Sequence, residues 1–150
     1  MDLHSGAQLL ALEWLVFGRA ACGEEVVSGQ ITESWRVRKD GRLIWADGFR
    51  VTDEIFPFLR KPALLGDFKT IATLIYFGPD LDRHQQRIRD LASSMTCRCV
   101  ATAVAGLLIV RFAAKTAGEL REGLRAVLHD FDFGAAAGAG PFRVPKMWSC

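Results

Sequence analysis

The residues best suited to chemistry lie near the start of the sequence. Glu13 stands alone at the centre of an apolar run, and Gly18-Arg19-Ala20-Ala21-Cys22-Gly23-Glu24 follows it. Two glycines give the backbone room to bend, and such a bend would bury an Arg–Glu pair. Buried carboxylates are also hard oxygen ligands that attract a divalent cation. Glu13, Arg19 and Glu24 are therefore either charges that pin a β-corner or polar positions that line a pocket or conduit.

Cys97 and Cys99 form a second, weaker candidate site. They are two residues apart, so on a strand both thiols point to the same side, and Met95 lies just before them. Sulfur ligands of this kind suit Ni, Cu or Zn, although two thiolates make at most half of a tetrahedral site. The alternative is that both residues face a core as small apolar side chains. The metal assignment and the packing assignment both remain open at this point.

The motifs of common enzymes are missing from the sequence. His4, His84 and His129 are far apart and fit neither HxH nor HExxH spacing. No Gly-x-Ser-x-Gly occurs, and the glycine-rich stretch Gly134–Gly140 lacks the Lys-Ser/Thr of a phosphate-binding loop. The sequence therefore predicts a protein that is not an enzyme.

Composition and charge exclude further classes of protein. The chain has 150 residues, of which 50% are hydrophobic and 24% charged, so we expect a single domain over residues 1–150. A net charge of +2 argues against a nucleic-acid partner. The apolar runs are shorter than the roughly 18 residues of a membrane span. Residues 1–6 do not form a basic region followed by an apolar one, so we expect no secretion by a signal peptide. We therefore expect a cytoplasmic protein with reduced thiols and no membrane partner.

A β-hairpin is the clearest local prediction. The run Ile31–Lys39 places Ile31, Glu33, Trp35 and Val37 on one face, and Asp40-Gly41 follows as a two-residue hairpin signal. The returning run Arg42–Val51 has apolar residues at odd positions, with Asp47 as an interruption.

The remaining elements follow from periodicity and capping. Four apolar or β-branched runs predict strands: Ala7–Phe17, Phe68–Phe77, Cys97–Ala105 and Leu107–Ala113. Thr52–Gly66, with two prolines, predicts a loop, and a helix is expected after Gly78-Pro79-Asp80. Thr116 and Glu119 fit a capping box before a second helix, whose apolar stripe comprises Leu120, Leu124, Val127, Leu128 and Phe131. The predicted class is mostly β, in sandwich-like or β-helix-like layers, flanked by two late α-helices.

Several of these segments resemble the urease accessory protein UreD (UreH) family. Residues 18–24 are similar to its Gly-Arg-x-Ala-x-Gly-Glu signature, and the hairpin around Asp40-Gly41 is similar to its strand, Asp-Gly, strand unit. Residues 106–111, Gly-Leu-Leu-Ile-Val-Arg, and the Val-Pro-Lys-Met-Trp ending resemble late motifs of the family. The likeness is to the C-terminal half of the family, since the Gly-Gly-Asp and Thr-Thr-Gln segments of its N-terminal half do not occur.

The resemblance implies a cytoplasmic scaffold or chaperone for urease maturation. Such a protein joins UreF and the GTPase UreG, docks on apo-urease and passes nickel through an internal polar tunnel, without a tightly bound cofactor. Glu13, Arg19 and Glu24 are then tunnel-lining or structural positions. The late helices would either meet UreF or be internal. Two alternatives are a small metal-binding protein that uses Cys97 and Cys99, and a truncated fragment without a function of its own.

Overall fold

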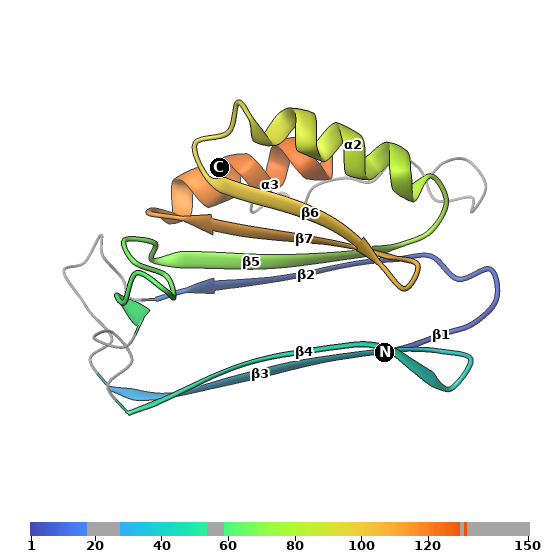
Figure 1. Cartoon of the computed structure of the whole chain (residues 1–150), viewed down its shortest axis with the longest axis horizontal. Helices are drawn as coiled ribbons and strands as arrows, with labels where there is room; N and C mark the ends of the chain where they lie inside the picture. Colours follow the sequence, from blue (N-terminus) through green and yellow to red (C-terminus); the bar gives the residue numbers. More distant parts are fainter. Residues whose placement is uncertain (18–27, 54–58, 130, 132–150) are drawn as a thin grey trace.

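The chain folds into three layers (Figure 1). The computed structural model describes residues 1–17, 28–53, 59–129 and 131. A pair of helices covers one face of a four-stranded sheet, and a hairpin-based sheet lies against the other face. The predicted class, mostly β with two late helices, is confirmed.

The predicted hairpin is the centre of the three-stranded sheet. It consists of β3 (Gly29–Lys39) and β4 (Arg42–Asp53), joined by Asp40 at φ 49° and Gly41 at φ 78°. Two left-handed residues make the type I′ turn that matches the twist of the paired strands. A two-residue strand, β1 (Asp2–Leu3), adds in parallel to β3, giving the order β1-β3-β4. β1 was not predicted, because two residues carry no periodicity.

The second sheet has the order β2-β5-β7-β6, with all neighbours antiparallel. Its strands are β2 (Leu9–Val16), β5 (Thr70–Phe77), β6 (Arg98–Val104) and β7 (Leu107–Ala114), close to the predicted runs. Another pair of left-handed residues, Ala105 and Gly106, closes the hairpin between β6 and β7.

The two helices are α2 (Leu81–Ala92) and α3 (Ala117–Leu128). The hydroxyl of Thr116 accepts a hydrogen bond from the Glu119 amide at 3.1 Å, as the capping box predicts. The Glu119 carboxylate, however, accepts from the amide of Lys115 at 3.1 Å rather than from that of Thr116. The reciprocal bond is thus made one residue earlier than in the standard box, and it still satisfies a free amide at the helix start.

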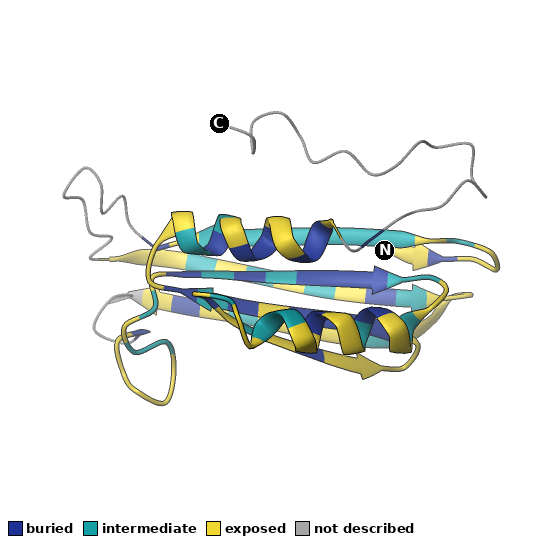
Figure 2. Ribbon diagram, turned by 90° about the horizontal axis from the view of Figure 1, so that it is seen from above, coloured by how far each residue is buried: buried dark blue, intermediate teal, exposed yellow. Residues whose placement is uncertain are grey.

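The apolar stripe of α3 belongs to the core. Its four residues in the helix, and Phe131 just after the helix ends, are all at most 3% exposed and belong to the cluster that packs on the four-stranded sheet: Leu120, Leu124, Val127, Leu128 and Phe131. Figure 2 shows the buried face of each helix turned to the sheet and the exposed face turned outward. Of the two alternatives for the late helices, the structure thus favours the one in which this stripe is internal. These side chains have almost no exposed surface with which a partner could make contact.

Candidate functional site: a polar belt between the sheets

The interior between the two sheets holds two apolar clusters. One includes Val37, Ile75 and Ile109, and the other includes Phe17 and Val51. Polar side chains lie between them. We call this set the inter-sheet polar belt, and its members are Glu13, Glu33, Asp47, Thr73 and Arg111.

Strand register places these residues in rows. Glu13 on β2 is the cross-strand partner of Thr73 on β5, which is in turn the partner of Arg111 on β7. Cross-strand partners have neighbouring side chains on the same face. The three residues therefore form a row that crosses the four-stranded sheet at right angles to its strands. On the opposing hairpin, Trp35 is the partner of Asp47, so a second polar position lies on the facing sheet.

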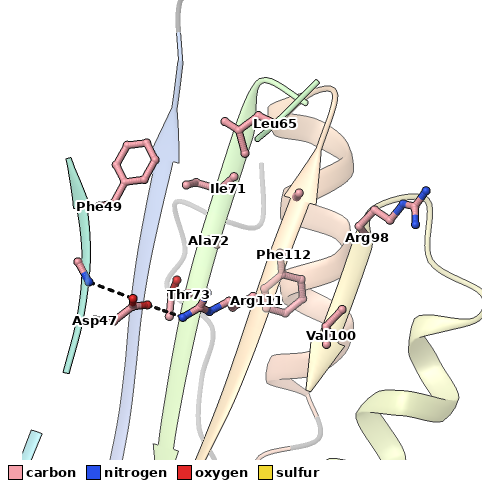
Figure 3. A pocket seen from close by; sticks show the side chains of 12 residues that line it. Asp47, Phe49, Leu65, Ile71, Ala72, Thr73, Arg98, Val100, Arg111 and Phe112 are labelled. Atoms are coloured by element: carbon pink, nitrogen blue, oxygen red, sulfur yellow. Dashed lines mark hydrogen bonds and ion pairs between the residues drawn. The ribbon is translucent and has the colours of Figure 1, made fainter. Parts of the chain in front are cut away.

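Two bonds join the sheets across this belt. Trp35 Nε1 donates to Glu13 Oε2 at 2.5 Å, and Arg111 Nη2 donates to Asp47 Oδ2 at 2.5 Å. Figure 3 shows Arg111 reaching from β7 to Asp47, whose other oxygen accepts from the Gly48 amide at 3.0 Å. The Trp35–Glu13 bond is partly buried, whereas the Arg111–Asp47 pair lies at the rim of the belt, because the Arg111 side chain is 59% exposed.

Glu13 and Glu33 form a carboxyl pair on facing strands. Burial, together with the hydrogen bond and the negative charge of Glu13, raises the pKa of Glu33 from 4.5 to about 7. Two adjacent carboxylates repel each other, so near neutral pH the pair holds one proton between its members. The raised pKa is that of Glu33, so this residue holds the proton below about pH 7.

This pair predicts a stability that falls as the pH rises. Since the pKa of Glu33 is higher in the folded state than its ordinary value of 4.5, the folded chain binds more protons between about pH 4.5 and 7. Solvent reaches the half-buried pair and screens part of the repulsion, so we expect a loss of about 1 kcal/mol over this window, levelling off above pH 7. Urea denaturation at a series of pH values measures it.

Glu33→Gln removes the titrating group and should flatten this part of the pH profile. The matched control is Asp67→Asn, because the Asp67 side chain is 88% exposed and lies outside the belt. Equal slopes for Glu33→Gln and wild-type chains would show that the two carboxyl groups do not share a proton.

A cavity of about 350 Å³ adjoins the belt at its Asp47–Arg111 end. Its polar wall consists of Asp47, Thr73, Arg98 and Arg111, and Phe49 and Ile71 are on its apolar wall (Figure 3). The belt therefore runs from the carboxyl pair at β2 and β3 to this cavity beside β7. Carboxylate oxygens along such a line can bind and release a hard or borderline divalent cation.

The structure places one of the three predicted charges in this site. Glu13 is a member of the belt, whereas Arg19 and Glu24 lie outside the described residues and stay predictions. Sequence reasoning missed the roles of Glu33 and Asp47. The signal was present, because each is a lone carboxylate on the apolar face of a hairpin strand.

Cys97 and Cys99 pack in the core under the helices. Cys97 is 4% exposed, and a Cβ added to Gly123 of α3 would lie only 2.3 Å from its sulfur. Burial raises the pKa of both thiols, that of Cys99 to about 12 with a further contribution from Cys97. A metal needs the thiolate, so these positions favour the packing alternative. Among the described residues no group of three or more His, Cys, Asp or Glu side chains could hold a metal ion.

The helices described by the structure include none long and apolar enough to span a membrane.

Fold and site together define a helix-flanked β-sandwich with a carboxyl pair between its two sheets and a charge pair that joins the sheets at the rim. A family model described as UreD urease accessory protein matches residues 1–149. The chain belongs to this family, as its motifs indicated.

Individual relatives agree with this assignment. The chain is 36% identical to the urease accessory protein UreD of Rhizobium johnstonii over 149 residues, which is 99% of this chain and 51% of the relative. It is 37% identical to that of Azorhizobium caulinodans, again over 99% of this chain and 52% of the relative. The chain thus spans about half the length of the curated relatives it matches.

Proposed function

We propose that this chain acts in the maturation of urease, as a non-catalytic accessory protein that helps nickel reach apo-urease. The role in maturation is supported by its family, whose members are named for it. The observation that carries the nickel part is the inter-sheet polar belt. Carboxylates between two sheets cost stability compared with apolar side chains, so their presence in the sandwich favours a use for them.

The belt suits transfer better than storage. Oxygen ligands hold Ni²⁺ more weakly than a closed set of His and Cys ligands would, so the ion can move on. At Glu13 and Glu33 an arriving cation would take the place of the proton that the pair holds. At Asp47 it would compete with the Arg111 guanidinium, which already neutralises the carboxylate. Each position therefore offers a ligand whose present partner can be displaced.

The partners follow from the family. We propose that the chain works with UreF and the GTPase UreG on apo-urease in the cytoplasm, and that nickel is a transient cargo. Arg19 and Glu24 join the proposal through the Gly-Arg-x-Ala-x-Gly-Glu motif, as further polar positions of the path.

The experiment is urease activation in cells that lack their own UreD gene but express this chain with UreF, UreG and apo-urease. At limiting nickel, Glu13→Gln should lower activation by about tenfold or more, the loss typical of disturbing the environment of a bound metal. An excess of nickel should restore part of it, because higher occupancy compensates for a weaker ligand.

The control variant is again Asp67→Asn, whose carboxylate is exposed. It should activate urease as well as the unmodified chain does. Absence of activation by the unmodified chain, or an equal loss in both variants at equal soluble protein, would contradict the proposal.

A further inference from the structure

β4 is an edge strand with an open side. In the strand order β1-β3-β4 its one strand neighbour within the described chain is β3, and it is 12 residues long. An edge of this length presents a row of backbone N–H and C=O groups that can pair with another strand. Proteins commonly protect such edges with proline, by keeping them short or with an inward-pointing charge. β4 contains no proline and is not short, and the inward-pointing charge of Asp47 is paired with Arg111.

In the opposite sheet, the face of β6 that is turned toward the hairpin sheet is exposed. Val100 is 63% exposed and Val104 is 42% exposed, both on the face turned toward the hairpin sheet. The alternate residues Cys99 and Ala101 pack in the core under the helices. One face of β6 is thus covered and the other, with its β-branched apolar side chains, is not.

The open edge of β4 and the exposed face of β6 lie next to each other. β4 is bonded to β7 through Asp47 and Arg111, and β6 is the strand beside β7. A hollow of about 320 Å³ lies between them, lined by Trp45 of β4 and by Val100 and Val104 of β6. A strand added to β4 at the usual spacing of about 4.8 Å would extend the hairpin sheet over β6.

The relatives contain the polypeptide that could fill this place. The Rhizobium johnstonii protein is matched over 51% of its length by 99% of this chain, so it holds about as much chain again outside the match. The Azorhizobium caulinodans protein is matched over 52%. Addition of a strand to a free edge uses main-chain hydrogen bonds for affinity and alternate side chains for specificity.

We propose that the β4 edge and the exposed face of β6 seat a β-strand from the half of a UreD protein that this chain does not match. The incoming strand pairs with β4 and turns its apolar side chains onto Val100 and Val104. This interface requires family membership but no nickel role, so its test is separate from urease activation.

The test is co-expression of the tagged chain with the unmatched half of the Rhizobium johnstonii relative. The two polypeptides should co-purify, and hydrogen exchange in the complex should slow at least tenfold, relative to the chain alone, at those amides of residues 42–53 that do not bond to β3. The double variant Val100→Lys/Val104→Lys should reduce the recovered partner at least tenfold. Both side chains are exposed, so the variant should still fold, which circular dichroism checks.

Val16→Lys is the matched control, because Val16 is 50% exposed on β2 at the other edge of the same sheet. It should retain the partner. The proposal is overturned when the chain purifies alone while the partner stays insoluble, or when both lysine variants bind equally. Protection, in the isolated chain, of the β4 amides that do not bond to β3 would also overturn it, as would self-association through β4, because something else would then occupy the edge.

Discussion

Leu124→Ala is expected to lower the free energy of unfolding by about 3 kcal/mol, within the range for fully buried leucines. Leu124 is 0% exposed and packs in the cluster between α3 and the four-stranded sheet. Removing its isobutyl group leaves a cavity that close-packed neighbours fill only in part. Urea denaturation followed by circular dichroism measures the loss.

Glu122→Ala on the exposed face of the same helix is the control and should change the stability by no more than about 0.5 kcal/mol. A loss below about 1 kcal/mol for Leu124→Ala would mean that α3 does not depend on this packing. The stripe would then be available to a partner after all.

Gly123→Ala is expected to destabilise the chain by about 2 kcal/mol, although alanine is the better helix former. The new Cβ would lie 2.3 Å from the sulfur of Cys97, which is itself buried at 4% exposure and so has little room to move away. Overpacking of this kind forces side chains off their rotamers. The same denaturation experiment measures the effect.

Cys97→Ala provides the rescue. It removes the clashing sulfur, after which the nearest recorded atom of residue 97 is its Cβ at 3.8 Å, an ordinary contact. The double variant should therefore be more stable than Gly123→Ala alone, which a double-mutant cycle quantifies. Additive losses would show that the Cys97 sulfur does not pack against Gly123 and would reopen its assignment as a ligand.

The fold was largely predictable because its signals are local. Asp40-Gly41 and Ala105-Gly106 supply the left-handed pairs that tight hairpins need, and Thr116 supplies a helix cap. β1 and the earlier return of Glu119 to Lys115 were not predictable. Both depend on how the ends of strands and helices are placed relative to one another in space, and sequence periodicity carries no information about that placement.

The site was predictable only in part, for a related reason. Periodicity placed Glu33 and Asp47 on apolar faces of the hairpin, and Glu13 at the centre of its strand. It did not indicate which sheet would face which. The pairs Trp35–Glu13 and Asp47–Arg111 join residues that are 22 and 64 positions apart, and only the stacking of the two sheets brings them together.

The central claim is that nickel enters the inter-sheet polar belt, and Ni²⁺ itself tests it directly because the ion is paramagnetic. When Ni²⁺ is titrated into the ¹⁵N-labelled chain, amide signals next to Glu13, Glu33 and Asp47 should broaden first. The double variant Glu13→Gln/Asp47→Asn should lose this broadening while keeping its other signals. Broadening confined to His4 or to the Cys97–Cys99 segment, with the belt signals unchanged, would contradict the account.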